Sequence, residues 1–556
     1  MAGDPFLSDP SKKRKRNRNT STTTNKRSRS STPQISSRSN HNIQQDEEIS
    51  SDSDIEDDDI LNNQPEGRQD EDLSSDEEFE NETATDKRRR LAKQYLENLK
   101  NEEIQNEEFD AQDLDDEILS RRLQIDVAET KGHVYKFWGD KIAQQLDDND
   151  NNHIKLITTR IGSKNLTNMC IYYPYLYTVS KDIEIIKWDI STTSKNINKK
   201  PTRIKHTKGG PKFFNLNTSQ QKLNHHWEQI NCIAASPDGK YIVTGGSDSR
   251  LIIWSSENLV CLKVLETRSS VNSITFKRNS DQLFAACSDL RIRTFSINQF
   301  TQLEVLYGHQ DNITDISSLA RETCVSVGSR DKTAMFWKVA EETRLTFRGG
   351  DSIEKKHPKN QQQQKSKQIN DNNDNDNKNK NNNNEPFHNE GSIDVVSMID
   401  ESHFVTGSDN GNIALWSLAK KKAQTTKRLS HGLQPQFKPQ EASAETSIDL
   451  ATQQIPEPQP YWITAIHAPA YSNIFLSGSF GGTVKIWKLD ETLRSFNLIG
   501  EIENLKGFVV KIDSVEISEL KKLKIFVLLS KEHKFGRWFN KLPGGRNALV
   551  SFTFDI

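Results

Sequence analysis

Hydrophobic residues are scarce in this sequence and make up only 33% of its 556 residues. Typical globular proteins contain about 45–50%, so part of this chain is expected to be unable to bury a core. No apolar run approaches the roughly 18 residues that span a membrane as a helix. The N-terminal residues also lack the apolar stretch of a secretory signal. These absences predict a soluble, intracellular protein without a membrane partner.

Cysteine is also rare, and its spacing excludes the usual cysteine chemistry. The five cysteines include no Cys-x-x-Cys pair, and an odd number does not suit a disulfide framework. We expect buried, inert thiols. The pair His225-His226 has no partner at metal-ligand spacing. Since no nucleophile–base pair or phosphate-binding loop is evident either, the sequence predicts no metal, no cofactor and no catalytic activity.

The net charge of −3 conceals a strong segregation of charge in the N-terminal region. Residues 11–30 carry basic side chains and no acid, and one run within them is typical of a nuclear import signal. That run consists of Lys12, Lys13, Arg14, Lys15 and Arg16. A solvated basic tail with weak affinity for nucleic acid is the alternative, and the two are compatible. Residues 46–59 and 70–82 are then almost entirely acidic or Ser, so residues 1–81 are predicted to be disordered.

Residues 82–130 have the pattern of a charged helical segment. Leu91, Tyr95 and Leu99 recur every four residues and predict an amphipathic helix over about 87–104. A second helical pattern follows an acidic opening, which suits the dipole of a helix start. Its apolar positions are Leu114, Ile118, Leu119 and Leu123. Neither stripe can be buried alone, so each is expected to dock on the rest of the chain, on RNA or on another protein.

One pattern then recurs seven times: a small-residue strand, a polar turn and a strand ending in an aromatic residue. In four copies an Asp stands six residues before the aromatic: Asp182 and Trp188, Asp248 and Trp254, Asp289 and Phe295, Asp331 and Trp337. Looser copies end at Trp416, Trp487 and Trp538. A period of about 40–50 residues with four short strands is typical of a WD-type β-propeller.

We therefore predict an all-β fold, a seven-bladed WD40 β-propeller over residues 131–556, with a disordered and partly helical N-terminal extension. The blades are expected near residues 154–190, 227–265, 268–307, 310–348, 391–430, 460–500 and 506–556. Residues near 154–160 are candidates to pair with the last blade and so seal the ring without a free edge.

Blade four contains the full set of polar residues that stabilises a WD repeat. In such repeats a loop His, a strand Ser or Thr, a turn Asp and the Trp form a hydrogen-bonded tetrad, here His309, Ser326, Asp331 and Trp337. The other blades lack the His or the Asp in part, and blade three has Phe295 in place of Trp. Because these residues recur with the blade, we interpret them as structural and not catalytic.

Three insertions interrupt the repeat, near residues 191–226, 352–388 and 432–459. The first is basic and contains Lys199, Lys200, Arg203, Lys205, His206, Lys208 and Lys212, followed by Phe213-Phe214. Basic residues beside aromatic ones suit phosphate binding with base stacking, although a solvated loop is the alternative. The second is a Gln/Asn/Lys/Asp tract that is predicted to be disordered. The third is polar and contains proline.

The stretch 82–96, ETATDKRRRLAKQYL, resembles the N-terminal motif of one family, the WD40 subunit of the U3 small nucleolar ribonucleoprotein. Residues 118–132 and 545–549 also resemble that family, as does the order of basic signal, acidic tract, charged helices and seven blades. The resemblance covers about 82–556 apart from the insertions. It is specific in the helix motif and generic in the blades.

The resemblance implies a non-catalytic protein that binds the box B/C region of U3 small nucleolar RNA beside a kink-turn-binding protein. It implies one copy per particle and assembly with other proteins of the small-subunit processome, which guides pre-ribosomal RNA cleavages toward 18S RNA. The implied location is the nucleolus, within the nucleus. Folded RNA of this kind is recognised mainly through shape and phosphate contacts.

Several cations in the turns near the tetrads are candidates for those phosphate contacts. They are Lys181, Arg250, Arg291, Arg293, Arg330, Lys332, Lys531, Lys534 and Arg537. Arg suits phosphate because its planar fork donates two parallel hydrogen bonds. Scattered surface charge is the alternative interpretation of the same residues.

A nuclear protein scaffold or peptide reader is the rival functional class. Such a propeller grips a peptide in an aromatic or acidic central pocket and depends little on a basic rim. RNA binding that weakens steeply with salt favours the first class, whereas binding of an isolated basic peptide favours the second.

Overall fold

The computed structural model describes residues 87–95, 116–147, 155–192, 199–210, 224–349, 391–439, 444–445, 447–455, 457–503, 505–534, 536 and 544–556. The predicted import signal, the acidic tract, the Gln/Asn-rich insertion, Arg537 and Trp538 lie outside these residues. Residues 87–95 form a helix within the predicted range, and its Leu91 and Tyr95 side chains are exposed. None of the helices in the described part is long and apolar enough to cross a membrane.

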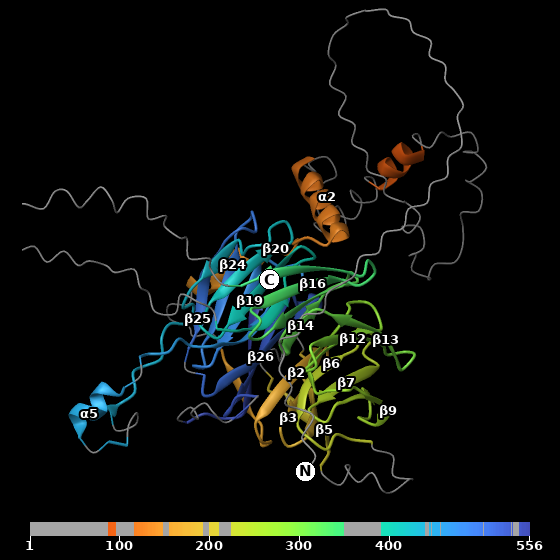
Figure 1. The fold of residues 1–556 in the computed structure, drawn as a ribbon. Helices are drawn as coiled ribbons and strands as arrows, with labels where there is room; N and C mark the ends of the chain where they lie inside the picture. Colours follow the sequence, from red (N-terminus) through yellow and green to blue (C-terminus); the bar gives the residue numbers. More distant parts are fainter. Residues whose placement is uncertain are drawn as a thin grey trace, which may run out of the picture. The chain divides into compact units, whose positions relative to one another are not determined.

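Seven four-stranded antiparallel sheets follow one another along the chain (Figure 1), which confirms the predicted seven-bladed propeller. Blade one consists of β2 (Leu166–Tyr172), β3 (Tyr175–Ser180), β4 (Glu184–Asp189) and β5 (Thr202–Lys208). Blade two consists of β6 (Ile230–Ala235), β7 (Tyr241–Gly246), β8 (Arg250–Ser255) and β9 (Cys261–Glu266). Blade three consists of β10 (Val271–Phe276), β11 (Gln282–Cys287), β12 (Arg291–Ser296) and β13 (Thr301–Tyr307).

Blade four consists of β14 (Ile313–Ser318), β15 (Thr323–Gly328), β16 (Thr333–Lys338) and β17 (Thr343–Arg348). Blade five consists of β18 (Ile393–Met398), β19 (His403–Ser408), β20 (Ile413–Ser417) and β21 (Thr425–Lys427). Blade six consists of β22 (Ile463–His467), β23 (Ile474–Ser479), β24 (Val484–Leu489) and β25 (Phe496–Ile502). Blade seven combines β26 (Phe508–Ile517), β27 (Lys522–Ser530) and β28 (Ala548–Asp555) with β1 (Ile157–Arg160) from the start of the propeller.

The ring is closed by β1, as the sequence suggested for residues near 154–160. This strand pairs antiparallel with β28, with Ile157 opposite Ser551 and Arg160 opposite Ala548. The last blade therefore draws strands from both ends of the propeller, and the outer edge of β28 is covered.

The predicted first insertion, 191–226, was drawn too long. Its residues 202–208 form β5, the outer strand of blade one, which pairs with β4. Six of the seven residues of β5 are exposed, because outer strands of a propeller face solvent. The strand therefore lacks the apolar alternation that marks a half-buried strand, and its Lys and Arg side chains resemble those of a loop.

Every inner strand has a β-bulge near its start, and in four of these strands the skipped residue donates a hydrogen bond to the next blade. In β6 the register shifts between Ile230 and Cys232, and the skipped residue Asn231 donates from Nδ2 to the Val271 carbonyl of blade three, 3.0 Å away. Equivalent bonds join Thr167 to the Ile230 carbonyl, Asn272 to the Ile313 carbonyl and Thr464 to the Val509 carbonyl. Since a bulge re-aims a side chain without ending the strand, these residues connect neighbouring blades around the channel.

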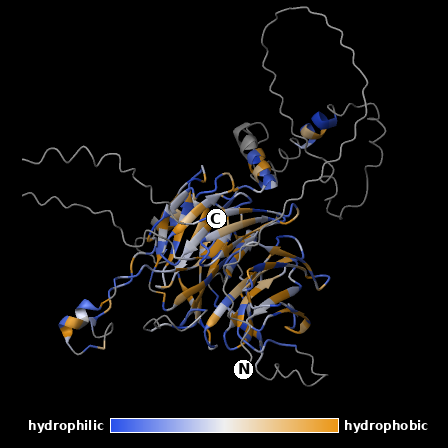
Figure 2. Ribbon diagram, in the orientation of Figure 1, coloured by the Kyte–Doolittle hydropathy of each residue, from blue (hydrophilic) through white to orange (hydrophobic). Residues whose placement is uncertain are grey.

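Apolar side chains between neighbouring blades form the core, and Figure 2 shows that hydrophobic residues are frequent in the strands of the blades. Buried Val243 and Ile253 of blade two, for example, share one cluster with Val271 and Leu283 of blade three. Each fully buried aliphatic side chain contributes roughly 1.5–3 kcal/mol. The inner strands are buried and the outer strands exposed, so the disc is stabilised mainly through contacts between blades.

The segment before β1 is anchored on the propeller by residues 132–138, here called the strap. The strap joins α2 (Asp116–Lys131) to α3 (Gly139–Asp147). Lys136 forms an isolated β-bridge with Ser472, and the Trp138 and Gly139 amides both donate to the side-chain oxygen of Asn473, at 2.9 and 3.0 Å. In α3, Ile142 is fully buried in the core shared by blades six and seven.

Candidate nucleic-acid interface

The four tetrad residues predicted in blade four lie within hydrogen-bond distance of one another. His309 Nδ1 is 2.9 Å from Asp331 Oδ2, and His309 Nε2 is 2.7 Å from Ser326 Oγ. The Trp337 indole N–H donates to the same Ser326 oxygen at 2.8 Å. These three hydrogen bonds hold the turn that contains Asp331 against the loop that enters β14. We call the side of the disc formed by these turns and entering loops the tetrad face.

Blade two contains an equally complete tetrad that sequence reasoning missed. His226 Nδ1 lies 2.9 Å from Asp248, its Nε2 lies 2.8 Å from Thr244, and the Trp254 indole donates to Thr244 at 2.8 Å. The sequence does contain the spacing that identifies this tetrad. The His and the Asp are 22 residues apart in blade two, as they are in blade four. The sequence prediction places His226 in the insertion 191–226, whereas the structure places it in the loop that enters β6.

Blade six has a variant in which a hydroxyl replaces the carboxylate. His431 lies 2.7 Å from Thr483 Oγ1 and 2.8 Å from Ser477 Oγ, and the Trp487 indole donates to Ser477. Burial, with a smaller effect from Lys485, lowers the pKa of His431 to about 3. This His is therefore neutral at physiological pH and has a structural role.

Two of the candidate RNA-binding arginines are buried and bonded within the protein. Arg293 is 3% exposed, and its guanidinium forms two hydrogen bonds with Asp289, at 3.0 and 2.5 Å. These bonds raise the pKa of Arg293. Arg250 is 6% exposed and donates to the His225 carbonyl. Neither guanidinium is presented to a phosphate in this arrangement, so we omit both from the proposed contacts.

Arg293 takes the place of the missing tetrad in blade three. Phe295 occupies the Trp position and has no indole N–H to donate, whereas Arg293 satisfies the turn carboxylate of Asp289 from the neighbouring strand β12. Burial raises the pKa of Asp289, but the hydrogen bonds from Arg293 outweigh this effect and hold it below its usual value.

The remaining candidate cations among the described residues do not form one patch on the tetrad face. Lys181 donates from Nζ to the His533 carbonyl at 2.7 Å, which ties blade one to the last blade. Lys534 lines the central channel together with Lys511 and Asp315, and burial lowers its pKa. Lys531 is exposed in the same segment, so three lysines lie on the side of blades seven and one, together with the carboxylates of Asp182 and Glu532.

The side of blades four and five is acidic instead. A groove of about 670 Å³ there is lined by Asp311, Asp394, Asp409, Arg330 and Trp462, among other residues. Burial, with a smaller effect from Asp409, raises the pKa of Asp394. Arg330 is thus surrounded by carboxylates, a less favourable setting for a phosphate than the side of blades seven and one.

The two further candidates for phosphate contact are Lys332 in blade four and Arg291 in blade three. Lys332 follows Asp331 in the blade-four turn and has a left-handed backbone, with φ of 55°. Arg291 packs its guanidinium over the Tyr307 ring, 4.8 Å from the ring centroid. Arg291 therefore faces the outer strand of blade three and lies away from the channel.

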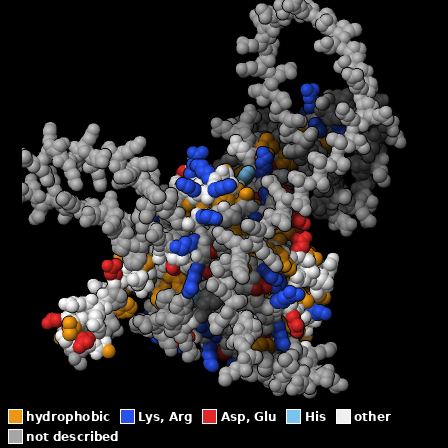
Figure 3. All heavy atoms as spheres, in the orientation of Figure 1, with side chains coloured by type: hydrophobic (Ala, Val, Ile, Leu, Met, Phe, Trp, Pro, Cys, Tyr) orange, Lys and Arg blue, Asp and Glu red, His pale blue; other side chains and the backbone are white. Residues whose placement is uncertain are grey.

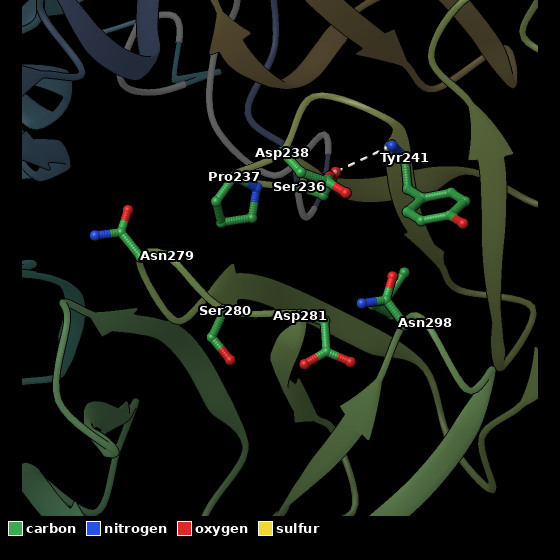
Figure 4. Close-up of a pocket in the computed structure, with 9 residues that line it drawn as sticks. Ser236, Pro237, Asp238, Tyr241, Asn279, Ser280, Asp281 and Asn298 are labelled. Carbon is green, nitrogen blue, oxygen red and sulfur yellow. Dashed lines mark hydrogen bonds between the residues drawn. The ribbon is translucent and has the colours of Figure 1, made fainter. Parts of the chain in front are cut away.

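The opposite face also carries charge that the sequence did not highlight. Lys420, Lys421 and Lys422 are exposed in the turn after β20, and Figure 3 shows Lys and Arg side chains gathered beside β20 and β24. Between blades two and three the same face holds a hollow of about 360 Å³ (Figure 4). Its carboxylates Asp238 and Asp281 accept hydrogen bonds from Ser236 and Ser296. That acidic hollow does not suit RNA.

The described side chains give no support to metal or thiol chemistry. In this part of the chain no group of three or more His, Cys, Asp or Glu is arranged to hold a metal ion. Burial raises the pKa of the Cys287 thiol to about 11 and also raises that of Cys170. Such thiols are protonated at neutral pH and are poor nucleophiles.

Comparison with known proteins places the chain in a family. A family model described as "WD domain, G-beta repeat" matches residues 217–255, 300–338 and 454–488. The chain is 43% identical over 529 residues to "Ribosomal RNA-processing protein 9" of Saccharomyces cerevisiae. This match covers 85% of this chain and 90% of that protein. It is 26% identical over 472 residues to "U3 small nucleolar RNA-interacting protein 2" of Homo sapiens, with 84% and 82% coverage.

Solved structures support the fold. One described as "Structure of U3-55K" matches with a TM-score of 0.53 and 24% identity, covering 71% of this chain and 98% of that chain. Similarity at 43% identity over 85% of the chain is decisive for the family. The chain therefore belongs to the family that the motif of residues 82–96 predicted, the WD40 subunits of U3 small nucleolar ribonucleoproteins.

Proposed function

We propose that this protein is a non-catalytic, RNA-binding subunit of the U3 small nucleolar ribonucleoprotein and acts in pre-ribosomal RNA processing in the nucleolus. The observation that carries the proposal is the 43% identity over 85% of the chain to a protein named for ribosomal RNA processing. The human relative, whose name states an interaction with U3 small nucleolar RNA, is similar over nearly the same share of the chain.

In finer detail, we propose that the protein binds the box B/C region of U3 RNA beside a kink-turn-binding protein, in one copy per particle, within the small-subunit processome. The side of blades seven and one on the tetrad face is the part of that face best suited to phosphate. Lys181 donates to the carbonyl of His533, and Lys531 and Lys534 lie on either side of His533 in the chain. The carboxylates Asp311 and Asp409 instead line the groove of blades four and five.

Crosslinking and sequencing of RNA bound to the tagged protein in its native cells tests the proposal. Dominant recovery of U3 RNA at its box B/C stem supports it. Recovery of diffuse RNA without U3 enrichment contradicts it.

A variant pair tests the proposed face. Replacing Lys531 and Lys534 by Gln is expected to reduce the salt dependence of U3 binding, because each lost phosphate contact lowers the slope of log affinity against log salt by about 1. The control replaces Lys240 and Lys263, exposed cations of blade two away from the tetrad face. Equal effects of both variants would assign the binding to general charge and not to this face.

The acidic groove keeps peptide reading as a second candidate function. Asp311, Asp409 and Trp462 give it the acidic and aromatic lining that grips a Lys- or Arg-rich peptide. Binding of an isolated basic peptide by the purified protein, lost on Asp311→Asn, would favour this function. No measurable peptide binding would leave RNA binding as the better account.

A further inference from the structure

Residues 432–459 leave the tetrad face between blades five and six as an arm with a closed base. Leu433 forms an isolated antiparallel bridge with Pro460, and the Gln434 amide donates to the Gln459 carbonyl at 2.8 Å. The described residues of the arm include the helix α5 (Ile448–Gln453), which projects away from the sheets in Figure 1. The two ends of the arm are thus fixed together while its helix stands off the disc.

The arm exposes apolar side chains at its helix. Ile448 is 69% exposed and Leu450 is 49% exposed, and Leu433 and Phe437 near the base are exposed as well. Figure 3 shows hydrophobic and acidic side chains side by side on α5. Six residues are far fewer than the roughly 12–15 that an isolated helix needs for even marginal stability in water. Packing against another molecule would supply the missing stabilisation.

The positions of the exposed apolar residues on α5 indicate the shape of the surface that can bind the helix. Residues two apart in a helix point in different directions, so a flat surface cannot cover Ile448 and Leu450 together. A groove that encloses the helix can.

The net negative charge of the arm indicates which side chains its partner carries. Residues 432–459 contain four acidic residues, Glu441, Glu445, Asp449 and Glu457, and one basic residue, Lys438. Such a segment repels an RNA backbone and is attracted to Lys and Arg. We propose that the arm is a docking element for a protein partner that presents an apolar groove rimmed by basic side chains. This inference goes beyond the proposed function and does not depend on RNA binding.

A photo-reactive amino acid at position 448 of the full-length protein, introduced in its native cells, tests the proposal. The expected result is a crosslink to one protein, at a peptide that lines an apolar groove with Lys or Arg around it. A crosslink to RNA, a crosslink to a second copy of this chain, or no crosslink would overturn the proposal.

Variants of the arm then test the contact with the purified partner. Replacing Ile448 and Leu450 by Asp is expected to weaken binding at least about tenfold, which corresponds to about 1.4 kcal/mol. Replacing Glu445 and Asp449 by Lys should weaken it as well, whereas the control Gln453→Ala should leave it within about twofold. Unchanged binding in the Asp variant would contradict the proposal.

Two controls separate this result from other causes. The thermal unfolding midpoint of each variant should equal that of the unaltered protein, because the arm stands off the blades. Recovery of U3 RNA is measured with the same variants. Loss of partner binding with unchanged RNA recovery supports the arm alone, and loss of RNA recovery in the unaltered protein would contradict only the proposed function.

Discussion

The hydroxyl of Tyr471 donates a hydrogen bond to Glu401 Oε1 at 3.1 Å and so joins the first turns of blades six and five. The same carboxylate also accepts from the amides of Ala320 and Arg321 in blade four, and from the Thr323 hydroxyl. The Glu401 amide donates to the carbonyl of Gly132 in the strap. The buried Glu401 side chain therefore joins three blades, and the backbone amide of the same residue holds the strap. Burial, and then the charge of Glu401, raises the pKa of Tyr471 to about 12.

Glu401→Ala should be strongly destabilising. The change leaves the partly buried amides of Ala320 and Arg321, the Thr323 hydroxyl and the buried Tyr471 hydroxyl without their acceptor. The expected loss of unfolding free energy is about 3 kcal/mol, measured by urea denaturation. The exposed Glu491 is the matched control, and Glu491→Ala should shift the midpoint little. Equal small shifts would contradict a central role for Glu401.

Arg293→Gln should separate structure from RNA binding. The substitution breaks a buried ion pair with Asp289, so a loss of about 3 kcal/mol in unfolding free energy is expected. The salt dependence of RNA binding should stay unchanged, because this guanidinium is not presented to solvent. The comparison variant Arg330→Gln, at an exposed turn, should leave stability nearly unaltered. A reduced salt slope for Arg293→Gln would restore it as a phosphate contact.

Features that repeat along the chain could be predicted from the sequence. The recurring strand, polar turn and aromatic-ended strand predicted seven blades, and the motif of residues 82–96 predicted the family. The 22-residue spacing from His309 to Asp331 also contained the information needed to find His226, but the insertion drawn over 191–226 hid it. The outer strand β5 was missed because an exposed edge strand carries no apolar alternation.

Features that depend on several distant segments could not be predicted. Glu401 is one acidic residue in a turn, and its partners come from blades four and six, which are far apart in sequence. The sequence predicts Arg293 as a candidate RNA contact because it does not show that β12 turns this side chain toward Asp289. The division of the tetrad face into a basic and an acidic side likewise appears only when the blades are set in a ring.

Removal of β1 should open the ring. A chain starting at residue 161 lacks Ile157–Arg160, whereas a chain starting at residue 155 keeps that strand, and both lack the strap. Burial of the Ile157 side chain alone is worth about 1.5–3 kcal/mol, so the shorter chain should unfold at lower urea concentration. It should also aggregate more, since the edge of β28 is then free to pair with another molecule. Equal stability and solubility of the two chains would show that β1 is dispensable for closure.

The stability of the propeller should fall in mild acid, and His431 should account for part of that fall. Burial lowers its pKa to about 3 in the folded protein, against about 6.5 in an unfolded chain. The unfolded state therefore binds more protons between pH 6.5 and 3, so the stabilisation is complete above pH 6.5 and is lost as the pH falls toward 3. His431→Asn should make the slope of unfolding free energy against pH shallower by up to about 1.4 kcal/mol per pH unit in this window. His206, exposed on β5, is the control, and His206→Asn should leave the slope unchanged. An unaltered slope in His431→Asn would mean that this His is protonated in the folded protein as readily as in the unfolded chain.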